Sequence, residues 1–493
     1  MSISLNPATI LSGQGIDVSS IVQQIISGES GQLTVWQGQQ TNFATQDGLL
    51  EGINNNLTSL QTAVAALASP TGPLTAQAAI SSQPNVVTAS AQSTAIAGTH
   101  QIVVTSLATN GTLYTNSFAA GANTSFLSSG QTSGDIQLQI GGASGATQDI
   151  PITQGSNDTL TTLANYINTQ STANNWGVTA SVVTDTTGAR LALQSQNTGS
   201  TGALAIANNS NTTLTFAAPQ GGANAVLTID NVPFSSASNT VTGAIQGVTL
   251  NLVSQSPGNP VQLTVGPDQN QITTAVNNFV SAYNNVISTI NTQYVVDPTG
   301  AVPAPPLESD ISLRSLQSSL LNDASNSVSV PGWPNLLGDS SETINLATLG
   351  INQNNDGTLT VGSNAAGQTF AQVLAANPAA VVNFFQNSSA TGFANAFNTD
   401  LTNLTNTISG PLYVDLAQNQ AEQADLTTTI NNFQAQLTAE TTALTQQYDA
   451  VNASLQQYPL LLQATTEVLG TLGSGTSETG QIISSEPTLT SGL

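Results

Sequence analysis

Apolar residues recur every seven positions between Leu33 and Leu67, a spacing that aligns them on one stripe of a long helix and favours a coiled-coil partner. The first row of this stripe contains Trp36, Phe43, Leu50, Leu57 and Val64, and the second contains Ile53, Leu60 and Leu67. Gln39 and Gln46 interrupt the second row, and each glycine inside the helix costs about 1 kcal/mol relative to Ala. The N-terminal part is therefore predicted to be a weak helix that needs a partner.

The C-terminal region repeats the seven-residue pattern. One row contains Ile430, Leu437, Leu444, Val451 and Tyr458, a second begins with Leu426 and Phe433, and a parallel stripe contains Tyr448, Leu455 and Leu462. Pro459 is expected to kink or end this helix near Tyr458, because proline removes a helical hydrogen bond. The Gly/Ser/Thr-rich tail, residues 470–493, is expected to be disordered.

Two further helices are predicted before this one. Asp268 is placed to cap the first, whose apolar face carries Ile272, Val276, Phe279, Tyr283, Val286 and Ile290. The second carries Phe393, Phe397, Leu401, Leu404 and Ile408. Both are amphipathic, and we expect them to pack with the terminal helices.

The middle of the chain has the period of β-strands. From Ile80 to Val265 the apolar runs are short, rich in Val, Ile and Thr, and bounded by Gly, Asn and Ser, which is typical of half-buried antiparallel strands. The clearest strands are 101–106, 177–184, 190–195, 225–229 and 247–253. One helix, Asp158 to Asn168, interrupts them, with Leu160, Leu163 and Ile167 on one face.

The expected fold class is therefore α+β. The N- and C-terminal segments form a discontinuous helical coiled-coil or bundle stalk, and antiparallel β-rich head domains are inserted between them. The simplest topology is a hairpin in which the two terminal helices pair, because each otherwise leaves a long apolar stripe unsatisfied.

Charge narrows the possible partners. The chain has 26 acidic residues against two arginines, Arg190 and Arg314, with no Lys and no Cys, so its formal charge is −24. Nucleic acids and anionic membranes are excluded as partners, because both are bound through Lys and Arg. No apolar run is long enough to span a membrane, and Met1 to Gln14 lacks the features of a secretory signal peptide.

The excess of acidic over basic residues also suggests that the protein works outside the cell in an acidic environment. At about pH 3 to 4 most carboxylates approach neutrality, so this chain would be nearly uncharged where an ordinary protein carries a large positive charge. The alternative is compositional economy in a secreted protein.

Short motifs occur along the whole chain, at residues 15–22, 225–232, 238–241, 245–250, 306–310, 313–316, 349–351 and 356–359. In their residues and their order, these motifs resemble the flagellar hook-associated protein 2 family, which forms the flagellar filament cap. Segment 158–195 resembles a small β module shared by flagellins and hook-associated proteins. Thr, Gln and Asn replace the Lys and Glu of the family's coiled coils, so salt bridges between chains cannot set the pairing here.

The resemblance implies a secreted structural protein at the distal tip of the bacterial flagellum, important for motility and without an active site, cofactor or metal. The implied partners are other copies of the chain in a homo-oligomer, flagellin, the flagellar type III export apparatus and an export chaperone. The implied domains are an export and leg segment (1–40), the N-terminal stalk (41–75), the first part of β head domain 2 (76–108), β head domain 3 (109–221), the second part of domain 2 (222–266), the C-terminal stalk (267–440), and a leg helix with a tail (441–493).

Two groups of apolar residues receive expected roles. The leg residues, nearest the chain ends, are expected to contact other subunits and flagellin: Ile21, Ile25, Leu33, Trp36, Phe43, Leu444, Tyr448, Val451, Leu455 and Tyr458. The stalk core is expected to contain Ile53, Leu57, Leu60, Val64, Leu67, Phe279, Tyr283, Leu426, Ile430, Phe433 and Leu437.

Other functions remain open from the sequence. A flagellin or hook–filament junction protein shares the same plan of terminal helices and inserted strands, and a surface adhesin would use the β region for cell adhesion to a receptor. Catalysis has weak candidates: a lone His100, a Gly475-containing serine motif in the tail, and the nearby carboxylates Asp297, Glu308 and Asp310. Asn354–Gly357 resembles half of a calcium loop but favours a turn, and Arg314 is spaced to bridge Asp310 on a helix.

Overall fold

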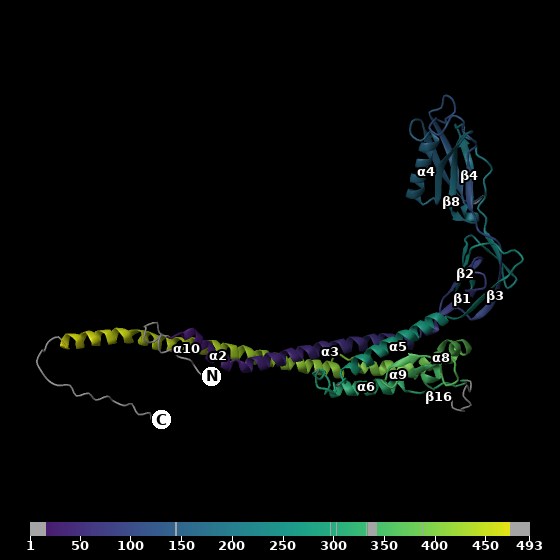
Figure 1. Cartoon of the computed structure of the whole chain (residues 1–493). Helices are drawn as coiled ribbons and strands as arrows, with labels where there is room; N and C mark the ends of the chain where they lie inside the picture. The colour runs from purple at the N-terminus through teal and green to yellow at the C-terminus, as the bar shows by residue number, and fades with distance from the viewer. Residues whose placement is uncertain are drawn as a thin grey trace. The chain divides into compact units, whose positions relative to one another are not determined.

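The computed structural model describes residues 16–142, 145–295, 297–301, 303–331, 333, 343–387 and 389–473. The chain folds into two compact units. Figure 1 shows the helices and strands of both. The helical unit comprises Met1–Thr58, Val286–Ser319 and Thr402–Leu493, and the mixed unit comprises Ser59–Asn285 and Leu320–Leu401. Four helices contribute residues to both units: α3 (Gly31–Ala68), α5 (Gln269–Thr292), α6 (Ile311–Ala324) and α9 (Phe393–Leu404).

Three helices give the helical unit its length: α2 (Val18–Glu29), α3 and α10 (Pro411–Gly473). Side-chain hydrogen bonds join α3 to α10, from Gln40 Nε2 to Thr427 Oγ1 and from Asn54 Nδ2 to Tyr413 Oη, each 2.8 Å long. Because the partner number on α10 falls as the number on α3 rises, the two helices are antiparallel. This confirms the predicted pairing of the terminal helices.

α10 does not end near Tyr458, one of the two outcomes expected at Pro459, but continues through this proline to Gly473. Proline leaves the carbonyl of Leu455 without its helical donor. Residues 460–471 are all exposed, so solvent can hydrate the helix here and the missing bond is tolerated. The first part of the predicted tail, 470–473, is therefore helical, and residues 474–493, including the serine motif, lie outside the described residues.

Two antiparallel sheets form a β-sandwich. The buried residues between them come mainly from β2, β3, β10, β12, β13 and β14. Its five-stranded sheet has the order β1-β14-β3-β10-β11, its three-stranded sheet has the order β12-β13-β2, and every pairing is antiparallel. Its strands are β1 (Gln77–Ser81), β2 (Val87–Ala91), β3 (Gly98–Ser106), β10 (Ala225–Ile229), β11 (Val232–Ser236), β12 (Thr240–Ile245), β13 (Val248–Leu252) and β14 (Val261–Pro267).

The chain between β3 and β10 forms a second core. Sheets β4-β8-β7 and β6-β5-β9 enclose it together with α4 (Leu160–Asn174), whose Leu160, Leu163 and Ile167 are fully buried as predicted. The strands are β4 (Asn110–Tyr114), β5 (Ser133–Ile140), β6 (Ala146–Thr153), β7 (Val178–Asp185), β8 (Gly188–Thr198) and β9 (Leu204–Ser210).

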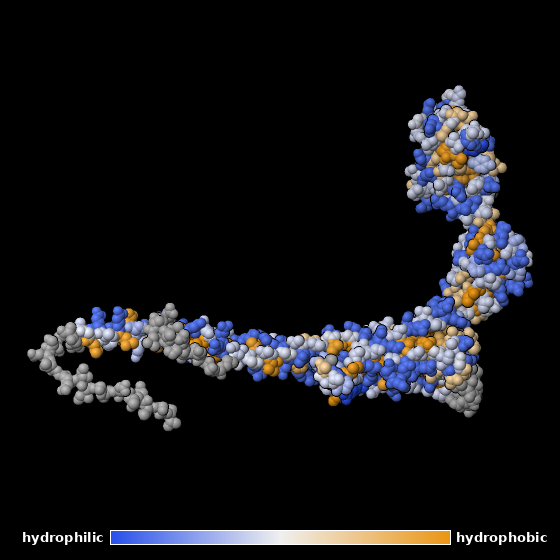
Figure 2. All heavy atoms as spheres, viewed as in Figure 1, coloured by the Kyte–Doolittle hydropathy of each residue, from blue (hydrophilic) through white to orange (hydrophobic). Residues whose placement is uncertain are grey.

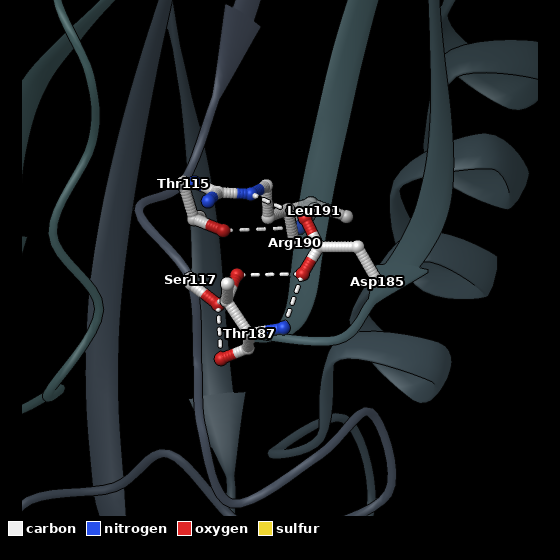
Figure 3. A network of polar contacts seen from close by, with 6 residues as sticks. All are labelled: Thr115, Ser117, Asp185, Thr187, Arg190 and Leu191. Carbon is white, nitrogen blue, oxygen red and sulfur yellow. Dashed lines mark hydrogen bonds and ion pairs between the residues drawn. The ribbon is translucent and has the colours of Figure 1, made fainter.

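Polar contacts hold the turn between β7 and β8 to the segment around Ser117, which follows β4 in the same chain (Figure 3). Asp185 Oδ1 accepts hydrogen bonds from the amide of Thr187 at 2.7 Å and its hydroxyl at 2.6 Å. These bonds, with Arg190 adding a weaker pull at 3.8 Å, hold the pKa of Asp185 below its ordinary value. Ser117 donates to the carbonyl of Thr187 at 2.7 Å.

The rest of the chain contains short elements that the sequence pattern did not reveal. They are α6 (Ile311–Ala324), β15 (Val328–Ser329), β16 (Thr343–Ile344), β17 (Ile351–Gln353), α7 (Phe370–Ala376) and α8 (Pro378–Phe385). Beside them lie the predicted α9 (Phe393–Leu404) and β18 (Leu359–Val361), which follows the turn predicted at residues 354–357. α9 ends before Ile408, which is 88% exposed, so that residue does not belong to the apolar face as expected. The Asp268 carboxylate accepts from the amides of Asn270 and Gln271 and caps α5, as predicted.

Aromatic rings fill the mixed unit between α5, α8 and α9. Phe279 contacts Phe393 and Phe397 edge-on, with ring centroids 5.9 and 6.1 Å apart. Tyr283, also fully buried, donates to the carbonyl of Leu320 at 3.4 Å, and burial raises the pKa of its hydroxyl. The hydroxyl of Tyr283 therefore makes a polar contact inside this largely aromatic core.

Asp323 of α6 is an acidic group in this core and is only 8% exposed. Burial, and then the neighbouring carboxylate of Asp400, raise the pKa of Asp323 to about 7. A raised pKa means that folding favours the protonated form. The stabilising contribution is therefore complete below the unfolded pKa near 3.8 and is lost as the pH rises through about 7.

Asp323→Asn should remove this pH dependence. We expect the variant to be more stable than the parent at about pH 8, by about 1 to 3 kcal/mol, and to differ little at about pH 4. Urea unfolding monitored by Trp333, with Trp36 and Trp176 replaced by Phe, reports on the mixed unit. Asp185→Asn is the control, since that carboxylate is exposed and its pKa is lowered. If the free energy of unfolding of Asp323→Asn depends on pH as it does in the parent, Asp323 is not the group responsible.

Candidate interaction surface of the helical leg

The candidate surface lies on the leg, defined as α2, residues 31–58 of α3, and α10. α2 begins at Asp17, whose Oδ1 accepts from the hydroxyl of Ser19 at 2.8 Å and the amide of Ser20 at 3.1 Å. The Ser19 hydroxyl is the larger cause that lowers the pKa of Asp17. The cap therefore favours a helix starting at Val18.

α2 packs against α10 and extends the antiparallel register of α3. The amide of Ile16 donates to Asn452 Oδ1 at 2.8 Å, and Val18, Ile21 and Val22 are buried. At the other end of α2, a hydrogen bond to Glu440 raises the pKa of the Glu29 carboxyl. The bond requires a shared proton, so this contact strengthens as the pH falls.

The sequence-predicted leg residues differ widely in exposure. Ile21 is buried against the chain's own helices, while Ile25, Leu33, Trp36, Phe43, Leu444, Tyr448 and Leu455 are half-buried. Val451 and Tyr458 are 50% and 63% exposed. The residues expected to contact partners thus lie on the leg helices, with exposure rising toward the end of α10.

Beyond Val451, α10 has almost no cover from the rest of the described chain. Leu460, Leu461, Leu462, Val468 and Leu469 are all more than half exposed. Figure 2 shows apolar atoms on this end of the helix. Such a run of exposed large apolar residues is typical of a surface that another molecule covers.

The expected stalk core is buried along α3. Ile53, Leu57, Leu60, Val64 and Leu67 are completely buried, as are Phe279 and Tyr283 of α5. On α10, Ile430 and Leu437 are 6% and 8% exposed, whereas Leu426 and Phe433 are half-buried. Phe433 contacts Trp36 edge-on, with ring centroids 5.3 Å apart, so the ring of Trp36 lies partly within the chain's own helix pair.

Two hollows open between the leg helices. One, of about 530 Å³, lies between α3 and α10 and is lined by Trp36, Phe43, Leu426 and polar residues including Glu422 and Asp425. The other, of about 440 Å³, lies between α2 and α10 and includes Val18, Val22 and Ile26. Both are lined by apolar side chains together with at least one carboxylate.

The catalytic candidates have structural contacts. His100 Nδ1 lies 2.7 Å from Asp230 Oδ2, and the other oxygen of Asp230 accepts from the amide of Gln101. This fixes the β10–β11 turn, where Asp230 and Asn231 have positive φ, to β3. No sequence pattern marked Asp230 as the partner of His100, although it stands in a quoted family motif.

The remaining acidic candidates stabilise turns and helix starts. Asp297 accepts from Thr299, Asp310 accepts from the amide of Leu313 at the start of α6, and Asp356 accepts from Thr358 at the predicted turn. Arg314 donates to the carbonyl of Glu308 and lies over the ring of Tyr294, so the expected bridge to Asp310 is wrong. Among the described residues, no group of three or more His, Asp or Glu is arranged to hold a metal ion.

Comparison with known proteins identifies the family. The model of the flagellar hook-associated protein 2 N-terminus matches residues 14–111, and that of the C-terminus matches residues 222–459. The chain belongs to the flagellar hook-associated protein 2 family. Together the two matches cover more than half of the chain and flank the segment that carries the second β core.

Relatives and solved structures agree with this family. The B-type flagellar hook-associated protein 2 of Pseudomonas aeruginosa is 31% identical over 334 residues, which cover 62% of this chain and 65% of that protein, just under two thirds of its length. The flagellar hook-associated protein 2 of Escherichia coli K12 is 28% identical over 66% of this chain and 71% of its own length. The crystal structure of the D1-D2-D3 domains of the Escherichia coli flagellar cap protein FliD superimposes with a TM-score of 0.52 at 25% identity, covering 76% of this chain and 99% of that one.

No helix among the described residues is both long and apolar enough to cross a membrane. The exposed apolar residues of α10 lie on a helix that also carries Gln, Thr and Glu. Their chemistry suits contact with other protein chains.

Leu437→Ala should weaken the pairing of α10 with α3. Leu437 is 8% exposed, and truncating a buried leucine costs about 2 to 4 kcal/mol. Leu461→Ala makes the same chemical change at a residue that is 61% exposed and should cost less than about 0.5 kcal/mol. Hydrogen exchange of peptides from α3 and α10 measures the loss of stability in each variant. Equal losses in the two variants would show that Leu437 is not packed against α3.

Proposed function

We propose that this chain forms an oligomeric cap at the distal tip of the bacterial flagellar filament, outside the cell, and promotes the folding and insertion of exported flagellin. Family membership carries the proposal, because related proteins are named as flagellar cap and hook-associated proteins. The exposed apolar end of α10 supports it, since an assembly factor needs a surface for other subunits.

In this function the leg helices contact neighbouring subunits and flagellin through the ten leg residues named from the sequence. Nine of the ten are half-buried or exposed, which supports repeated binding and release, while Ile21 is buried against the chain's own helices. A helix that has few buried contacts in its own chain opens locally at low free-energy cost, which suits a structure that must move as the filament grows. The family is a structural one, and we propose no catalytic role.

Delivery to the tip follows from the same proposal. The chain would leave the cell through the flagellar type III export apparatus with the help of an export chaperone, and the first residues would act as the signal. Residues 1–15 lie outside the described residues, so this expectation rests on the family alone. The β domains supply the exposed surface of the cap, where an adhesive contact with a receptor would also be made.

Leu444→Asp combined with Val451→Asp should abolish capping. Both residues lie on α10 beyond its buried core, and two carboxylates would make an apolar contact unfavourable. The measurement is filament growth from purified flagellin seeds, with electron microscopy of the tips. The β domains should remain folded by circular dichroism.

The matched control changes two exposed valines of the β domains, Val183→Asp and Val253→Asp, which are 54% and 53% exposed. It adds the same charge and should leave capping intact. If the α10 variant still caps filaments, α10 is not the docking leg. If the purified parent chain forms long filaments instead of plates with legs, a flagellin-like function replaces the proposal.

A further inference from the structure

The hollow between α3 and α10 has a distinctive charge pattern. We call it the leg groove and define it by Trp36, Gln39, Asn42, Phe43 and Gln46 on α3 and by Glu422, Asp425, Leu426 and Thr429 on α10. Its volume is about 530 Å³, and Trp36, Phe43 and Leu426 form its apolar part. All three are half-buried, so apolar surface remains uncovered within the chain.

The charged residues of the leg groove are carboxylates. Glu422 accepts one hydrogen bond, from Gln418 Nε2 at 3.2 Å, and the Asp425 carboxylate has no hydrogen-bond or ion-pair partner among the described residues. Beside the groove, Asp47 Oδ2 accepts from Gln423 Nε2 at 2.5 Å, while its Oδ1 is buried without a partner. The surface therefore combines apolar side chains with negative charge that this chain does not neutralise.

No cation of this chain can supply the missing charge through a leg helix. α2, α3 and α10 contain nine carboxylates, and their sequences contain no Lys, Arg or His. A leg helix from a second copy would bring further carboxylates against Glu422 and Asp425. Like charges brought together at an interface repel each other, so at neutral pH the groove disfavours binding of a second copy of this chain.

We propose that the leg groove binds an amphipathic helix of a different protein, one that sets Lys or Arg beside an apolar face. The apolar face would cover Trp36, Phe43 and Leu426, while the cations pair with Glu422 and Asp425. The inference rests on the proposed function, in which the leg docks onto another protein, and it adds the chemistry of that partner. Self-assembly of the chain then uses leg residues outside the groove, such as Val451 and Tyr458, while Trp36 and Phe43 contact the other protein.

The charge requirement can be tested with designed peptides and the full chain. The probes are two amphipathic helices of about 18 residues, about 27 Å long, with the same leucine face and either Lys or Glu on the polar face. The chain has no Cys, so Gln39→Cys gives a single site for a fluorophore in the groove. At neutral pH and low salt, the Lys peptide should bind at least about tenfold more tightly than the Glu peptide and weaken as salt is added.

Two variants with the same net charge separate the groove from general attraction. Glu422→Gln with Asp425→Asn removes two carboxylates from the groove and should weaken binding of the Lys peptide by about tenfold. Asp449→Asn with Glu467→Gln removes two carboxylates from α10 outside the groove and should change binding by less than about twofold. Equal losses in both variants, or equal binding of the two peptides, would overturn the proposal.

Binding of a second copy of this chain in the leg groove would give a different experimental result. If the unlabelled Gln39→Cys variant forms disulfide-linked dimers at neutral pH and the Glu422/Asp425 variant changes the oligomeric state, the groove is a contact between copies and the proposal fails. Capping assays separate this inference from the proposed function. Normal capping by the Glu422/Asp425 variant with loss of capping by the Leu444/Val451 variant overturns only the charge requirement, whereas persistent capping by both overturns the docking leg.

Discussion

The antiparallel pairing of α3 with α10 is the interaction on which the helical unit depends. The two helices are separated in sequence by residues 69–410, so closing the pair has a loop entropy cost that burial must offset. Leu50, Ile53 and Leu57 on one helix and Leu412, Ile430 and Leu437 on the other are buried. Exposing either apolar stripe to water would be unfavourable, so the two helices pair. The β domains are therefore an insertion between the two helices of one pair.

The near absence of cations decides how this pair is held together. The leg helices contain no Lys, Arg or His, so specificity comes from neutral hydrogen bonds such as those of Gln40 and Asn54 with α10. Two pairs of carboxyls do lie close together, and these contacts raise the pKa of Glu29 beside Glu440 and of Asp323 beside Asp400. At these two sites acidification strengthens the contact, whereas it weakens an ordinary ion pair. This is the behaviour that an acidic exterior would favour.

The sequence predicted the elements whose burial is periodic and missed those whose structure depends on distant contacts. Seven-residue spacing located α3 and α10, and alternation located β10 to the residue, because one face of each is buried over much of its length. α7 and α8 are too short to show a period, and their order comes from packing of Phe370, Phe384 and Phe385, which are all buried. Pro459 misled because its effect depends on solvent around the helix, and the partner of His100 lies 130 residues away in sequence.

The distribution of burial along α10 links the fold to its use. Leu412 is 2% exposed, Leu437 is 8%, Val451 is 50% and Leu469 is 69%, so the helix loses its cover step by step. A helix without tertiary contacts is only marginally stable in water, and its order must come from whatever packs against it. The end of α10 retains a high content of leucine and valine that its own chain does not use. A partner that covered this end would gain apolar contact and stabilise the helix at the same time.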